Sequence, residues 1–171
     1  MEINKRILAG LDRMGIEYEI ISHPPAHTME ECALPERLLG GVMPKNLFLR
    51  PRRQEEFYLC VARADAPFKT SVVSKQAGAS RLGFASEEEL YRLLLTRPGA
   101  ISPLALMLEE AGEVSLLVDK SLKDEERLIF HPCVNTYSVA LSGKDFFEKF
   151  LPAVGHSVTW VVMSPDGDSN Q

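Results

Sequence analysis

The sequence predicts an α+β fold, a single domain in which a mixed, curved or barrel-like β-sheet is surrounded by helices. Its 171 residues, 45% of them hydrophobic and without a biased tract, suffice for one well-packed core. Short alternating apolar segments and amphipathic segments are interspersed without a strict strand-helix-strand order. Two apolar runs, 46–49 and 57–61, flank a charged stretch and read as an antiparallel hairpin. Together these patterns favour a mixed sheet with helices outside it.

The helices are predicted from apolar spacing and from capping residues. Ile3, Ile7 and Leu11 share one helical stripe that ends before Gly15, a residue suited to a C-terminal cap. Ser86 and Glu89 have the spacing of a capping box. Pro24 and Pro25 interrupt the chain, and residues 35–44 read as a glycine-containing loop. Helices are expected over 3–14, 71–77, 86–95, 104–110 and 142–150, and a short helix is expected to begin near residue 29.

The strands are predicted from two-residue alternation and from apolar runs bounded by turns. They are expected over 17–22, 46–49, 57–61, 81–84, 113–119, 128–130, 137–141 and 157–163. The domain should therefore occupy residues 1–163, followed by a polar C-terminal tail over 164–171.

Composition excludes several classes of protein. No apolar run approaches the roughly 18 residues of a membrane span, and the first residues lack the apolar core of a signal peptide, so a cytoplasmic location is expected. The net charge of −5 argues against a general nucleic-acid binder. Cys32, Cys60 and Cys133 are odd in number and widely spaced, which predicts reduced thiols. Cys133 lies near His131 in sequence, and a nucleophilic role for it is the less favoured reading.

Lys45 stands at the start of an apolar run, Leu47-Phe48-Leu49, which is an unusual place for a lysine. Its ammonium group needs either a route to solvent or an anionic or carbonyl partner, because burying an unpaired charge is costly. Taken alone, the position favours a stem that lies along apolar surface with its charge in water. A functional reading needs support from other segments.

Two further segments supply that support. Gly99 to Pro103 is a glycine loop that leads into a predicted helix, where backbone N–H groups can hold a carbonyl oxygen or an anion. His131 follows the strand over 128–130. His23 and His27 are four residues apart, but the prolines between them disfavour the helix that a paired metal site would need, and no metal or cofactor is expected. Motifs typical of common hydrolases, kinases and dehydrogenases are absent from the sequence.

The order and spacing of these motifs resemble those of the YbaK/PrdX-like prolyl-tRNA editing proteins, which are related to the editing insertion domain of bacterial prolyl-tRNA synthetase. The resemblance rests on Lys45-Asn46-Leu47-Phe48-Leu49, on Gly99-x-x-x-Pro103, and on the segment from Phe130 to Thr136. It implies an aminoacyl-tRNA deacylase of the YbaK fold class. The branch it most resembles removes alanine from tRNA specific for proline. The sequence departs from the family at Pro44 and at Leu104-Ala105, which bears on amino-acid selectivity.

The resemblance also implies roles for individual residues. Lys45 would anchor the terminal phosphate or carbonyl region of the substrate, backbone N–H groups from Gly99 to Ser102 would stabilise an oxyanion, and His131 would orient the ribose or a water. A role for Lys45 as a general base is the less favoured alternative. The substrate-binding residues expected in addition are Ala26, His27, Thr28, Met29, Asn46, Ala100, Ile101, Pro103 and Asn135.

The expected partner is the acceptor end of a tRNA that carries a small amino acid, with prolyl-tRNA synthetase as a second candidate. An alternative function is a non-catalytic module that senses an aminoacyl-tRNA or an amino acid and regulates a partner. A third, weaker reading is an interaction protein that only keeps the fold.

Overall fold

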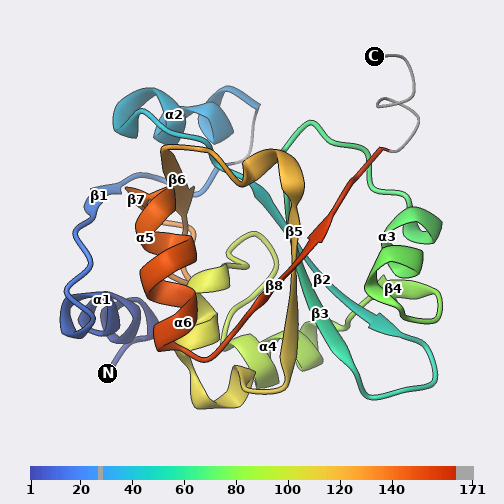
Figure 1. The fold of residues 1–171 in the computed structure, drawn as a ribbon. Helices are drawn as coiled ribbons and strands as arrows, with labels where there is room; N and C mark the ends of the chain where they lie inside the picture. Colours follow the sequence, from blue (N-terminus) through green and yellow to red (C-terminus); the bar gives the residue numbers. More distant parts are fainter. Residues whose placement is uncertain (27–28, 165–171) are drawn as a thin grey trace.

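A computed structural model describes residues 1–26 and 29–164, with the backbone but not the side chains of residues 29, 30 and 32. It confirms a mixed α+β domain (Figure 1). The expected tail lies outside the described residues except for Ser164. None of the helices in the described part of the chain is long and apolar enough to cross a membrane.

The strands divide over two open sheets where a single curved or barrel-like sheet was expected. One sheet has the order β1-β7-β6 and the other β4-β2-β3-β5-β8. The first consists of β1 (Glu19–Ser22), β6 (Arg127–Phe130) and β7 (Tyr137–Ser142). The second consists of β2 (Lys45–Pro51), β3 (Phe57–Ala62), β4 (Leu82–Phe84), β5 (Val114–Asp119) and β8 (Val158–Val161).

The larger sheet is mixed in direction. β2 and β3 form the antiparallel hairpin that the sequence predicts, with Lys45 opposite Ala62. β3 pairs in parallel with β5, and β5 in parallel with β8. Because β3 and β5 run in the same direction, the chain between them must return to the end of the sheet at which β3 begins. This connection contains α3 (Thr70–Ala77), α4 (Glu87–Leu94) and the loop of residues 97–102. This crossover delivers the glycine loop to the region where β2 begins.

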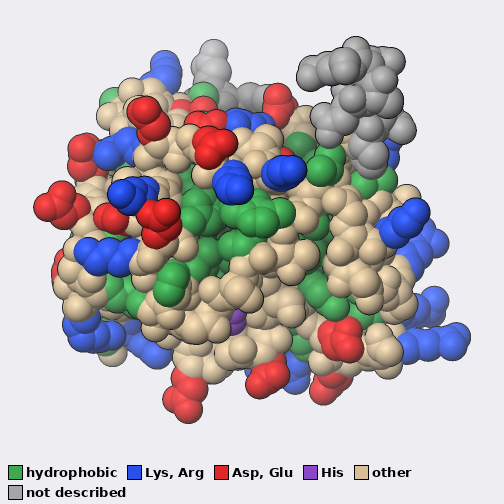
Figure 2. Space-filling view, viewed as in Figure 1, with side chains coloured by type: hydrophobic (Ala, Val, Ile, Leu, Met, Phe, Trp, Pro, Cys, Tyr) green, Lys and Arg blue, Asp and Glu red, His purple; other side chains and the backbone are tan. Residues whose placement is uncertain are grey.

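Helices pack around the two sheets (Figure 1). α1 (Ile3–Arg13) packs on the short 3₁₀ helix η1 (Pro103–Met107), and α2 (Met29–Leu39) packs on β1 and β6. Ser142 caps a continuous helix whose turns are α5 (Gly143–Asp145), the π-turn η4 (Phe146–Phe150) and α6 (Leu151–Ala153). Two further 3₁₀ turns are η2 (Glu109–Ala111) and η3 (Lys120–Leu122). Figure 2 shows hydrophobic side chains gathered in the middle of one face, with charges of both signs around them.

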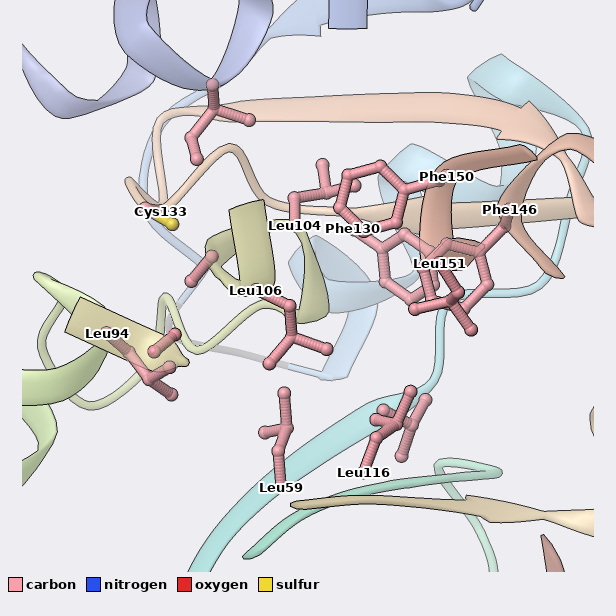
Figure 3. Close-up of a cluster of buried hydrophobic side chains, with 14 of the residues drawn as sticks. Leu59, Leu94, Leu104, Leu106, Leu116, Phe130, Cys133, Phe146, Phe150 and Leu151 are labelled. Atoms are coloured by element: carbon pink, nitrogen blue, oxygen red, sulfur yellow. The ribbon is translucent and has the colours of Figure 1, made fainter. Parts of the chain in front are cut away.

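The main core lies between the two sheets and the crossover segment. Leu104 and Leu106 are buried and point into a cluster with Leu59, Phe130 and Phe150 (Figure 3). Burial of side chains of this size contributes about 1.5–3 kcal/mol each relative to exposure. The segment that follows the glycine loop is thus fixed by core packing, which holds the loop itself in place.

Two expected elements differ from the structure. α2 continues through Pro35 to Leu39, where a loop over 35–44 was expected. Pro35 and Leu39 are one helical turn apart and both are buried, and Leu39 packs against Ile129 of β6, which offsets the backbone bond that the proline removes. The helix expected over 104–110 is instead the two 3₁₀ turns η1 and η2, separated by an extended Leu108. In an α-helix, Leu104 and Leu108 would share one face and Leu106 would point to the opposite side, whereas the break allows all three leucines to be buried.

Candidate functional site

A cavity of about 450 Å³ opens where the start of β2 meets the glycine loop and the end of β6. Its lining includes five of the residues that the sequence singled out for function: Lys45, Asn46, Gly99, Ile101 and His131. The other lining residues come from α2, from the segment before β2 and from the chain after β3: Ala33, Glu36, Met43, Pro44 and Ala64. Three segments distant in sequence thus converge on one site.

A parallel bridge brings Lys45 and His131 together. Val42 pairs with Leu128, its N–H donating to the carbonyl of Arg127 over 3.0 Å and its carbonyl accepting from Ile129 over 2.9 Å. Lys45 and His131 each lie three residues beyond this bridge, and the two segments run in the same direction, so both side chains arrive at the same place. Gly41 permits the approach, since a Cβ there would lie 2.9 Å from the Arg127 carbonyl oxygen.

The glycine loop is tied to both of these segments. The side-chain amide of Asn46 donates to the carbonyl oxygen of Ile101 over 3.1 Å. The hydroxyl of Thr96, which is 2% exposed, lies 3.0 Å from the carbonyl oxygens of both Ala100 and Cys133. Each pair of the three segments is therefore joined by hydrogen bonds. Nothing in the local sequence marked Thr96, because its partners become neighbours only in the folded chain.

The loop itself is a tight turn of the type II pattern. Pro98 and Gly99 occupy its central positions, Gly99 has φ of 89°, and the Ala100 N–H donates to the Arg97 carbonyl over 3.1 Å. The Ala100 N–H is thus used within the turn, which narrows the expected set of oxyanion donors. The N–H groups of Gly99 and Ile101, residues that line the cavity, are not used by this turn bond.

Lys45 is half-buried, and its ammonium group donates to the carbonyl oxygen of Ala66. The sequence left open whether this ammonium reaches solvent, an anion or a carbonyl group, and in the structure its partner is a carbonyl group. Within residues 1–26 and 29–164, no ion pair with a carboxylate neutralises this ammonium. Glu36, the other charged residue in the lining, is engaged by the Met43 N–H over 2.9 Å.

His131 is held in one orientation. Its Nδ1 lies 2.8 Å from the Tyr137 carbonyl oxygen, which can only accept, so Nδ1 carries a proton. Burial lowers the pKa of His131, opposed by the bond to Tyr137 and assisted by the nearby charge of His23. The neutral ring then has Nε2 as a hydrogen-bond acceptor. The His23 ring centroid lies 6.0 Å away, and His23 itself bonds to Ser138 over 2.7 Å.

Other predicted site residues lie elsewhere. Ser102 is fully buried, and its side-chain oxygen accepts from the Leu104 N–H over 3.1 Å, capping η1. Pro103 is buried in the first turn of the same helix. Ala100 and Asn135 line a different cavity, and exposed Ala26 lines neither. His27 and Thr28 lie outside the described residues, as does the side chain of Met29.

The two free thiols in the described part of the chain are buried. Burial raises the pKa of Cys133 to about 12 and, with the Asp119 charge, raises that of Cys60 to about 12 as well. A thiol with such a pKa is protonated at neutral pH, which disfavours it as a nucleophile.

The family assignment follows from sequence comparison. The sequence pattern of the aminoacyl-tRNA editing domain matches residues 23–149, a span that contains the whole cavity lining. The chain belongs to the aminoacyl-tRNA editing domain family.

Relatives from bacteria and animals match over nearly the whole chain. The prolyl-tRNA editing protein ProX of Acetoanaerobium sticklandii is 33% identical over 157 residues, covering 92% of this chain and 95% of ProX. The prolyl-tRNA synthetase associated domain-containing protein 1 of Danio rerio is 32% identical over 168 residues, covering 97% of this chain and 89% of that protein.

Solved structures agree on the fold. A crystal structure provisionally described as a trans-editing enzyme for prolyl-tRNA synthetase superposes with a TM-score of 0.72 at 15% identity, covering 96% of this chain and 99% of that one. The hypothetical protein APE2540 gives a TM-score of 0.70 at 19% identity. The editing-domain fold is therefore shared well below the sequence identities of the relatives above.

The positions where this chain departs from the editing-family pattern fall in different environments. Pro44 lines the cavity. Leu104 and Ala105 are fully buried in the main core. The departure at Pro44 therefore bears on the cavity wall, whereas the other two change core packing behind it.

Proposed function

We propose that this editing-domain protein hydrolyses the ester bond of mischarged aminoacyl-tRNA in trans, with alanyl-tRNA specific for proline as its substrate. Membership of the aminoacyl-tRNA editing family supports the reaction class, and the similarity to ProX supports prolyl-tRNA editing. The proposal places the protein in the cytoplasm, where charged tRNA is used.

One observation carries the proposal: Lys45, the Gly99 turn and His131 line a single cavity although they come from three separate segments. A cation, free backbone donors and a neutral imidazole are the groups that an activated ester requires. An aminoacyl ester needs positioning and polarisation of its carbonyl, and no covalent nucleophile.

The chemistry follows from these groups. The ammonium of Lys45, held by the Ala66 carbonyl, attracts the terminal phosphate or the carbonyl region of the substrate. The Gly99 and Ile101 N–H groups are placed to stabilise the oxygen that becomes negative when water adds to the carbonyl carbon. Nε2 of His131 accepts a hydrogen bond from that water or from the terminal ribose hydroxyl. The bond between the carbonyl carbon and the ribose oxygen then breaks, the ribose oxygen takes up the proton that the water has lost, and alanine and tRNA are released.

Selectivity for a small amino acid would come from the apolar part of the lining. Ala33, Met43 and Ile101 present hydrophobic side chains to the cavity, which suits a methyl group. A pocket of limited size rejects a larger substrate by steric exclusion, which is how a second editing site spares the correctly charged tRNA.

A deacylation panel tests the proposal. Alanine, serine, cysteine and proline esters of their tRNAs are incubated with wild type, with Lys45→Ala, and with Lys144→Ala as a control that removes an exposed lysine outside the cavity. The alanyl ester on tRNA specific for proline should be hydrolysed fastest, and Lys45→Ala should lose at least tenfold in kcat/KM. Equal rates for wild type and a folded Lys45→Ala protein would refute the role of Lys45.

The alternative of a binding module without turnover makes a different prediction. It requires saturable binding of aminoacyl-tRNA without hydrolysis of any ester in the panel. The same cavity would then serve as a sensor site, and Lys45→Ala would weaken binding only.

A further inference from the structure

A second cavity, of about 630 Å³, shares the glycine loop with the first. Alternate residues of the loop line the two spaces: Gly99 and Ile101 line the first cavity, and Pro98 and Ala100 line the second. The remaining walls of the second cavity come from α1, from the end of α4 and from residues 133–135. The backbone of this loop therefore separates the two cavities, and a ligand that fills the first cavity lies next to the second.

The charge of the second cavity is positive. Arg6 and Arg97 are the charged residues of its lining, and no aspartate or glutamate contributes to it. Within residues 1–26 and 29–164, neither guanidinium forms an ion pair. In a chain of net charge −5 these two arginines form a local positive patch, which favours an anion. The lining of the first cavity instead combines Lys45 with Glu36 of α2, and so carries charges of both signs.

An aromatic side chain lies beside the cations. Tyr91 is 51% exposed, and the Arg97 guanidinium lies 5.1 Å from the centre of its ring. An exposed ring next to an arginine is a stacking platform for a nucleobase, and Asn135 in the same lining offers amide groups for a base edge.

We propose that this second cavity binds the nucleotide that precedes the esterified one in the single-stranded 3′ end of the tRNA. Arg6 and Arg97 contact the phosphodiester that joins the two nucleotides, and the base stacks on Tyr91. This inference rests on the proposed function, since the ester must occupy the first cavity for its 5′ neighbour to reach the second. It makes the Pro98-Gly99 turn the point over which the strand passes.

Two substrates of different length test the proposal. Alanyl-adenosine ends at the esterified nucleoside and lacks the preceding nucleotide, whereas alanyl-tRNA has it. The Arg6→Ala/Arg97→Ala double variant should raise KM for alanyl-tRNA at least tenfold, and the loss on alanyl-adenosine should be at least fivefold smaller. Arg13→Ala, which removes an exposed arginine of α1 outside the lining, is the matched control. Equal losses on the two substrates would overturn the assignment.

Salt dependence and ring replacement separate binding from a structural effect. Removing a phosphate contact should reduce the slope of log KM against log salt by about 0.7 per contact, as for single strands. Arg97→Lys keeps the charge and should retain the wild-type slope. Tyr91→Leu should raise KM at least fivefold, while Tyr91→Phe keeps the ring and should not. An unchanged slope in the double arginine variant would contradict the phosphate contact.

A binding measurement separates this inference from the proposed function. An uncharged RNA oligonucleotide with the tRNA 3′ sequence is titrated into wild type and the double arginine variant, with adenosine monophosphate as the short comparison. If wild type binds the oligonucleotide more tightly than adenosine monophosphate and the double arginine variant does not, the second cavity is supported even if no ester is hydrolysed. Equal affinity of both proteins for the oligonucleotide would refute it even if the deacylase reaction is established.

Discussion

The buried hydroxyl of Thr96 lies 3.0 Å from the carbonyl oxygen of Cys133, and so joins the glycine loop to the chain that follows His131. The same hydroxyl lies 3.0 Å from the Ala100 carbonyl inside the turn. Its one proton is shared between two acceptors that belong to different segments of the site. Thr96 does not line the first cavity, and in the proposed reaction it acts by holding two segments of the site in register.

Replacement of Thr96 by valine keeps the shape of the side chain and removes the hydrogen-bond donor. We expect a loss of about 1–3 kcal/mol in unfolding free energy, because buried carbonyl oxygens lose a partner. We also expect kcat to fall more than KM rises, since the groups around the ester move relative to one another. Thr96→Ser, which restores the hydroxyl, should recover most of both. Denaturant unfolding and deacylation kinetics measure the two effects.

The control for this variant is Ser74, a buried serine whose hydroxyl accepts from the Leu82 N–H over 2.9 Å, outside the candidate site. Ser74→Ala should destabilise the protein without changing kcat. If Thr96→Val and Ser74→Ala altered kcat equally, the effect would be one of general stability and Thr96 would have no positioning role.

Gly99 should be intolerant of a side chain because of its backbone and not because of crowding. Its φ of 89° is unfavourable for an L-residue, while the nearest atom to an added Cβ is Asn135 Nδ2 at 4.0 Å. Gly99→Ala should cost about 1–2 kcal/mol. If the alanine relaxes the turn, the Gly99 and Ile101 N–H groups reorient and kcat falls.

Gly78 is the matched control for that substitution. It ends α3 with φ of 69°, and no atom lies within 4 Å of an added Cβ. Gly78→Ala should therefore lose a similar unfolding free energy with unchanged kcat. Comparable kcat losses in the two variants, measured at equal fraction folded, would argue against the turn as part of the oxyanion site.

His131 should make both stability and activity depend on pH on the acid side of neutrality. Burial lowers its pKa in the folded state, so the unfolded chain binds a proton at higher pH than the folded one. Stability therefore falls as pH drops below about 6.5, the ordinary value of a histidine. Protonation also removes the Nε2 acceptor, and kcat should decline at a pH below that ordinary value.

His131→Asn isolates this contribution, since its amide can still donate to the Tyr137 carbonyl. Burial also lowers the pKa of His156, but that residue remains in both proteins and cancels in the comparison. The change in unfolding free energy between pH 8 and pH 5 should be smaller in the variant than in wild type. An identical pH dependence of stability in both proteins would show that His131 does not resist protonation.

The sequence predicted most local elements because their signals are local. The capping box of Ser86 and Glu89 forms as expected at α4, and Ser142 caps α5. The β2–β3 hairpin needs only its two apolar runs and the charged turn between them. The parallel pairing of β3 with β5 was beyond such signals, because it depends on where a crossover of some fifty residues returns.

The candidate site shows the same division. Lys45 and His131 could be identified as unusual side chains, but their proximity depends on the bridge between Val42 and Leu128, which only the fold produces. The glycine pair that precedes Val42 was visible in the sequence, yet its purpose, a close approach to the Arg127 carbonyl, was not. Ser102 was predicted as a site residue for its place in the motif, and its side chain serves as a helix cap.

Cys60 and Cys133 should resist alkylation in the native protein. Burial raises the pKa of each thiol to about 12, so at pH 8 both thiols are protonated and the reactive thiolate is scarce. Native protein treated with iodoacetamide at pH 8 should therefore show no modification of either residue by peptide mapping, whereas denatured protein should show full modification of both. Rapid labelling of native Cys133 with parallel loss of deacylation would reverse this conclusion, because only an accessible thiolate beside the His131 segment reacts in that way.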